Sequence, residues 1–116
     1  MPKHKFPAKV HDAVWERCGG YCEKCGLPLQ DNNWHWHHRL LKSQGGKDSV
    51  TNGIAVHWQC HSIIHTNPMQ AYEYGYMVPM GNNPAEWRLT LPNGRSVRLS
   101  EDGHYDYLND DEKEGA

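Results

Sequence analysis

The chain has a single phenylalanine, and only 37% of its 116 residues are hydrophobic. No apolar run approaches the roughly 20 residues that a membrane-spanning helix needs, and the basic residues 1–7 do not resemble a secretory leader. We therefore expect a cytoplasmic protein. A chain this short is expected to form one domain with a thin core, and small domains often depend on a bound metal for stability.

The chain also lacks a large excess of either charge, since its net charge is only −2 at pH 7. The two signs are unevenly placed: residues 1–100 hold 11 Lys and Arg against seven acids, a net +4, whereas residues 101–116 hold seven acids and one Lys. A basic body is compatible with a nucleic-acid partner but is weak evidence for one. The acidic stretch 104–116 is predicted to be a disordered tail.

Apolar periodicity and the positions of glycine and proline predict a small α+β fold. The predicted helices cover residues 8–18, 59–66 and 69–74, and the predicted strands cover 34–38, 54–56 and the two arms of a hairpin, 87–91 and 95–99. A polar, glycine-rich loop at 42–53 separates the first two strands. We divide the chain into a basic arm (1–7), a central domain (8–75), a hairpin extension (76–103) and the acidic tail (104–116).

The cysteines of a cytoplasmic protein are expected to be reduced, and therefore available as metal ligands. Cys22 and Cys25 are separated by two residues, as are His57 and Cys60. Because such spacing presents both members of a pair to the same ion, the two pairs predict a structural Zn²⁺ with four protein ligands. Cys18 is an alternative ligand, but we favour His57 because Cys18 falls at the end of a predicted helix.

A second pattern is rich in histidine and runs in the order His37-His38, Gly45-Gly46, Asn52, His61 and His65. His61 and His65 are four residues apart, so they share one face of the predicted helix and can grip one ion. Together with the cysteine pairs, this order resembles the HNH endonucleases, a family of ββα-metal nucleases, over about residues 14–68. As a small, free-standing HNH domain with the run Cys-His-Ser-Ile-Ile-His-Thr-Asn-Pro at 60–68, the chain resembles the stand-alone HNH proteins of tailed bacteriophages.

The resemblance implies a DNA endonuclease with one divalent metal, and it assigns a role to each residue. His37, His61 and His65 would hold the ion, for which Mg²⁺, Mn²⁺, Ni²⁺ and Zn²⁺ are all candidates. His38 would be the general base, since a neutral imidazole can take a proton from water near pH 7. In the family a backbone carbonyl typically holds the other nitrogen of that base, and Asn52 would brace the loop that supplies the carbonyl.

The resemblance also implies partners. DNA is the expected substrate, and phosphate contacts are expected from Arg39, Lys42 and Lys47. The similar phage proteins often work beside a terminase in genome packaging, which makes terminase subunits candidate partners and the host cytoplasm the expected compartment. His35 alternates with His37 along the predicted strand and is left without a role. The alternative function is a non-catalytic, zinc-stabilised nucleic-acid-binding module, although such a module would not need a general base.

Overall fold

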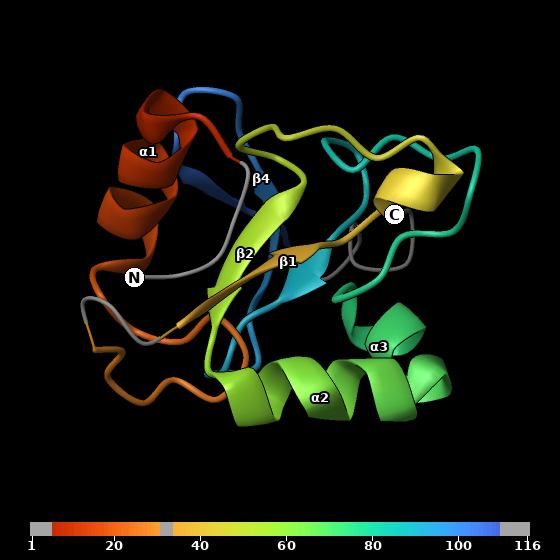
Figure 1. Cartoon of the computed structure of the whole chain (residues 1–116), viewed down its shortest axis with the longest axis horizontal. Coiled ribbons are helices and arrows are strands. Elements are labelled where there is room, and N and C mark those ends of the chain that lie inside the picture. The colour runs from red at the N-terminus through yellow and green to blue at the C-terminus, as the bar shows by residue number, and fades with distance from the viewer. Residues whose placement is uncertain (1–5, 31–33, 110–116) are drawn as a thin grey trace.

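The computed structural model describes residues 6–30 and 34–109 and has the predicted α+β fold (Figure 1). In chain order, its elements are α1 (Ala8–Cys18), β1 (His35–His38), the short 3₁₀ helix η1 (Lys42–Gln44), β2 (Gly53–Val56), α2 (Trp58–Thr66), α3 (Pro68–Tyr74), β3 (Leu89–Thr90), β4 (Ser96–Leu99) and β5 (Tyr105–Tyr107). Strands β1 and β2 form one antiparallel sheet, and β3, β4 and β5 form a second in that order.

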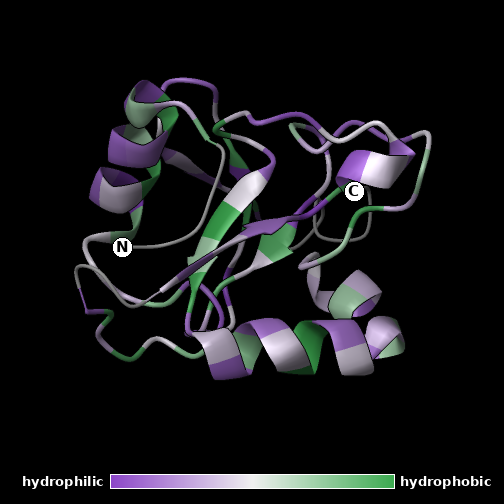
Figure 2. Ribbon diagram, in the orientation of Figure 1, coloured by the Kyte–Doolittle hydropathy of each residue, from purple (hydrophilic) through white to green (hydrophobic). Residues whose placement is uncertain are grey.

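The sheet of β1 and β2 is flanked by two helices. Helix α1 packs against β2, whereas α2 contacts β1 and runs along the lower edge of the view (Figure 1). All four residues of β2 are buried, and Figure 2 shows this strand as largely hydrophobic. In the register of the pair, His37 lies opposite Ile54. The buried strand β2 therefore supports the strand that holds His37 and His38.

The predicted C-terminal hairpin is present, with Leu89 of β3 opposite Val97 of β4. Neither of these side chains is exposed to solvent. Both belong to the same cluster of buried apolar residues as Val14 of α1 and Ile54 of β2. Residues of the segment that we predicted to be an extension thus help to form the core that supports the first sheet.

The prediction of a disordered tail is wrong for the first residues of 104–116. Tyr105–Tyr107 form β5, which pairs with β4, and Leu108 is buried. The prediction relied on the acidic composition and overlooked the two tyrosines: Tyr105 donates to Glu23, and the Arg95 guanidinium lies over the Tyr107 ring. Residues 110–116, with most of the acidic side chains, lie outside the described part of the chain.

A buried ion pair ties β5 to the N-terminal half of the chain. The Arg17 guanidinium donates to both carboxylate oxygens of Glu23, at 2.9 and 2.8 Å. The carboxylate also accepts hydrogen bonds from the Ala55 backbone N–H at 2.9 Å and from the Tyr105 hydroxyl at 2.6 Å. Because every charged oxygen is hydrogen-bonded, burial of this pair is tolerated, and removing one partner would leave an uncompensated charge.

The predicted basic arm is anchored at its last residues. Phe6 is 4% exposed and stacks on Trp36, with ring centroids 4.1 Å apart. Residues 1–5 lie outside the described part of the chain. Within residues 6–30 and 34–109, no helix has the length and apolar character needed to cross a membrane.

Candidate metal centres and their surroundings

Cys22, Cys25, His57 and Cys60 come together in a cluster whose ligand atoms all lie within 4.8 Å of one another. The first two residues lie in the loop after α1, whereas His57 precedes α2 and Cys60 lies in its first turn. The Cys25 sulfur and the His57 Nδ1 are 3.4 Å apart. Two such ligands on one tetrahedral Zn²⁺ would be about 3.5 Å apart, so the cluster fits this ion.

The local backbone suits a thiolate cluster. The Cys22 sulfur accepts hydrogen bonds from the backbone N–H groups of Lys24 and Cys25, both at 3.4 Å. Gly26 turns the chain here with a φ of +82°, in the left-handed region that favours glycine. Burial and the neighbouring sulfurs raise the pKa of Cys60 to about 12. A bound cation would reverse that effect, since metal coordination deprotonates a thiol.

Cys18 lies outside this cluster. It is buried at the end of α1, where its thiol donates to the Trp15 carbonyl at 3.4 Å. Burial raises the pKa of Cys18 to about 11, a shift of the same kind as that of Cys60, so the position of Cys18 outside the cluster is what separates the two thiols. Of the two alternatives left open by the sequence, the structure brings His57, and not Cys18, beside Cys22, Cys25 and Cys60.

A second cluster consists of His37, His61 and His65, whose ligand nitrogens also lie within 4.8 Å of one another. The ring of His37 is 5.1 Å from that of His61 and 5.3 Å from that of His65, measured between centroids. His37 comes from β1, and the other two lie one turn apart on α2. The contact between β1 and α2 is therefore what assembles the three imidazoles.

His37 has one nitrogen engaged and one free. Its Nε2 lies 2.7 Å from the Tyr76 carbonyl oxygen, which can only accept, so Nε2 carries the proton. Its Nδ1 is buried and has no hydrogen-bond partner among the described residues. An orphaned buried nitrogen normally costs free energy. A metal ion held with His61 and His65 would satisfy it, so this donor set fits a divalent cation.

The electrostatics of the histidine cluster favour neutral rings. Burial, followed by the nearby His61, lowers the pKa of His37 to about 3. Burial together with His65 and His35 lowers the pKa of His61 to about 4. Neutral imidazole is the form that coordinates a metal, so His37 and His61 can each offer one unprotonated nitrogen at physiological pH.

His38 is held by a carboxylate that the sequence analysis did not single out. Its Nε2 lies 2.8 Å from the Asp48 Oδ1, and the two side chains are 20% and 23% exposed. The hydrogen bond from His38 holds the pKa of Asp48 below its ordinary value, so the carboxylate is charged and the imidazole donates. Phe6 packs on the His38 ring, with centroids 4.5 Å apart. The expected backbone carbonyl is thus replaced by a side-chain carboxylate.

Asn52 fastens the loop that carries Asp48. Its amide Nδ2 donates to the carbonyls of Leu40 and Lys47, at 3.0 and 2.9 Å, and its Oδ1 accepts from the Leu40 N–H at 2.7 Å. Gly46 lies in the same loop, where an added Cβ would be 1.7 Å from the Leu40 carbonyl oxygen. Asn52 contacts only backbone here, so its effect on His38 passes through the shape of the loop.

Both clusters, His38 and Asn52 fall within residues 22–67, the segment that matches the family of HNH endonucleases. That segment belongs to the HNH endonuclease family. No curated protein and no solved structure matches the chain. Within the HNH segment, β1, the loop, β2 and α2 give the strand, strand and helix that the resemblance implies.

Arg39 of the HNH segment does not have the DNA-contacting position that we predicted. Its side chain is 0% exposed, so the guanidinium cannot reach a phosphate. Instead it donates to five backbone carbonyls at 2.8–3.1 Å, those of Thr51, Gly75, Pro84, Trp87 and Arg88. Burial lowers the pKa of Arg39 to about 9, so it remains charged at neutral pH. The residue after the doublet therefore holds the loops around the HNH segment together.

The other two predicted DNA contacts, Lys42 and Lys47, are exposed near the HNH loop. The Lys42 Nζ is 3.4 Å from the Asp48 carboxylate, so it shares the anion that holds His38. Lys47 has its backbone carbonyl tied to Asn52, while its side chain reaches solvent. Both ammonium groups are available to a phosphate, in contrast to Arg39.

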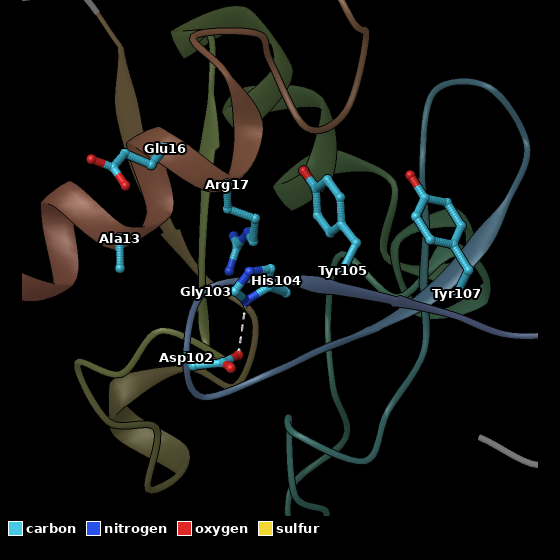
Figure 3. Close-up of a pocket in the computed structure, with 8 residues that line it drawn as sticks. All are labelled: Ala13, Glu16, Arg17, Asp102, Gly103, His104, Tyr105 and Tyr107. Atoms are coloured by element: carbon cyan, nitrogen blue, oxygen red, sulfur yellow. Dashed lines mark hydrogen bonds and ion pairs between the residues drawn. The ribbon is translucent and has the colours of Figure 1, made fainter.

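A hollow of about 430 Å³ lies beside α1 and the β4–β5 turn (Figure 3). Its lining includes Arg17, Tyr105 and the hydrogen-bonded pair Asp102 and His104, which is exposed (Figure 3). None of the clustered cysteines and histidines lines it. The hollow is therefore separate from both clusters.

Proposed function

We propose that this chain is a metal-dependent endonuclease that hydrolyses DNA phosphodiester bonds. The observation that supports it most is the pairing of His38 with Asp48 at 2.8 Å, one residue from the cluster of His37, His61 and His65. His38 belongs to neither cluster, and a charged residue that orients a non-ligand imidazole is a feature of general-base catalysis that a structural metal site does not require. Membership of the HNH family supports the same reaction.

His37, His61 and His65 would hold one divalent ion, through the free Nδ1 in the case of His37. When bound, such an ion supplies positive charge that stabilises the scissile phosphate and the departing 3′-oxygen. The donor set of three imidazoles suits Zn²⁺, Ni²⁺ and Mn²⁺ better than Mg²⁺, which prefers oxygen ligands. Cys22, Cys25, His57 and Cys60 would hold a structural Zn²⁺, since four protein ligands leave no open position.

His38 acts as the general base. Asp48 accepts the proton on Nε2, which leaves Nδ1 with a lone pair that can take a proton from water. The water oxygen then bonds to phosphorus as the bond to the 3′-oxygen breaks, and the water proton moves to His38 Nδ1. Asn52 is a positioning residue, because it fixes the loop that holds Asp48 in reach. Packing of Phe6 against the imidazole restricts its rotation.

DNA would approach over the exposed side chains of Lys42 and Lys47, which we retain as phosphate contacts. Because their ammonium groups are mobile point charges, they would add affinity without reading base sequence. A role beside a terminase in genome packaging rests on the resemblance to phage proteins alone and stays a prediction.

The function is tested on supercoiled plasmid with protein whose structural zinc content has been verified. Cleavage is expected in the presence of at least one of Mg²⁺, Mn²⁺, Ni²⁺ and Zn²⁺. His38→Ala should lower the rate by about 10² to 10⁴ while metal and DNA affinity stay near those of the wild type. His104→Ala, an exposed histidine near the separate hollow, is the matched control. If the wild type cleaves no DNA with any of the four ions, the non-catalytic module replaces the nuclease.

A further inference from the structure

His35 lies against a member of the histidine cluster. Its Nδ1 is 3.1 Å from the Nδ1 of His61, and the two rings meet edge to face with centroids 5.3 Å apart. His35 is the first residue of β1 and alternates with His37, so both rings point toward α2. Yet His35 lies outside the set of three whose nitrogens can share one ion. His35 therefore contacts the candidate ligand His61 but is not itself part of the cluster.

The other candidate ligands show what such a contact does. His37 directs its Nε2 to the Tyr76 carbonyl at 2.7 Å, and His57 directs its Nε2 to the Pro28 carbonyl at 2.9 Å. In both rings Nε2 donates its proton to a carbonyl oxygen, so Nδ1 keeps its lone pair for a metal. Metal-binding histidines generally have such a partner, which fixes both the tautomer and the orientation of the ring.

We propose that His35 is a positioning residue that plays this part for His61. The His61 Nδ1–H donates to the His35 Nδ1, and the His61 Nε2 is thereby left unprotonated for the catalytic ion. A hydrogen bond between two neutral imidazoles requires one donor and one acceptor nitrogen, and 3.1 Å is a normal length for it. The inference rests on the proposed function only in taking the His37, His61 and His65 cluster as a metal site.

The contact matters because His61 has little else to hold it. Its ring is half-buried on the first turns of α2. Its neighbours in the cluster, His37 and His65, are imidazoles that would bind the same ion. Without His35, the ring could rotate or take the other tautomer, and part of the population would present N–H instead of a lone pair to the ion. Losing such an outer partner generally weakens metal binding by about 10–100-fold.

The test is calorimetric titration of Mn²⁺ and Ni²⁺ into protein that keeps its structural zinc. His35→Ala should weaken binding about 10–100-fold. His35→Asn should restore much of it, because the asparagine Oδ1 occupies nearly the position of Nδ1 and accepts the same proton. His104→Ala serves as the matched control and should bind as the wild type does. Unchanged binding by His35→Ala, or no binding by the wild type, would overturn the inference.

Nitrogen NMR of the imidazoles gives a readout that needs neither metal nor cleavage. In the metal-free wild type, His61 should be the Nδ1–H tautomer, and His35→Ala should shift it toward the tautomer with a proton on Nε2. A His61 ring already protonated on Nε2 in the wild type would refute the assignment. A change in the Co²⁺ absorption spectrum that indicates one ligand fewer in His35→Ala would make His35 a ligand instead. If plasmid cleavage fails while these results hold, only the nuclease proposal falls.

Discussion

Replacing Asp48 tests whether the carboxylate acts on catalysis through His38. The bond between them is charge-assisted, 2.8 Å long, and joins side chains that are 20% and 23% exposed. Charge-assisted hydrogen bonds contribute about 1.5–3 kcal/mol, and the partial exposure favours the lower end of that range. If the bond is fully expressed in the transition state, Asp48→Ala should lower kcat by roughly ten- to thirtyfold. KM should change little.

The assay is single-turnover cleavage of a short duplex, which separates the chemical step from product release. Asp48→Asn should lose less than Asp48→Ala, because the amide oxygen still accepts from Nε2. The double variant His38→Ala/Asp48→Ala should be no slower than His38→Ala alone, since residues that act as one unit are not additive. Lys42→Ala is the control for the second partner of Asp48 and should raise KM but not lower kcat. Additive losses in the double variant would show that Asp48 does not act through the base.

Three further predictions concern the framework of the site. Arg39→Leu should cost about 5 kcal/mol in urea unfolding, because five carbonyls, two buried and three partly buried, lose their donor at about 1 kcal/mol each; a stable variant that only loses DNA affinity would reinstate the phosphate contact. Cys25→Ser should release the structural zinc and unfold much of the protein, whereas Cys18→Ser should keep its zinc, as measured by elemental analysis. Tyr105→Phe should lower the free energy of unfolding by about 1.5–3 kcal/mol without changing kcat, because Glu23 loses a donor 2.6 Å away.

Those parts of the site that depend on local spacing could be predicted from the sequence. The two pairs separated by two residues and the pair separated by four each lie on a single turn or helix, so their geometry follows from local structure. The predicted helices and hairpin share this property, and the structure differs from them mainly at their ends. The matched spacing of the two pairs also predicted that they would share one ion, whereas the grouping of His37 with His61 and His65 followed only from the resemblance to a family.

Residues whose role depends on a distant segment were missed or misread. Asp48 lies ten positions from His38 in the irregular part of the loop after η1, and nothing in the sequence indicates which side chain turns back to the imidazole. Arg39 was interpreted by its charge and its place beside the doublet. Its burial follows from chain that returns from residues 75 and 84–88, and such long-range packing has no signature in residue spacing.

The environment of Arg39 limits the transfer of the HNH segment into another protein scaffold. Four of its five carbonyl partners, those of Gly75, Pro84, Trp87 and Arg88, lie beyond residue 67, where the family match ends. An excised segment 22–67 would carry a buried cation without most of its acceptors. A host scaffold that received this segment would have to supply a comparable ring of carbonyls or an apolar residue in place of the arginine. The smallest transferable unit of this chain is therefore larger than its recognisable motif.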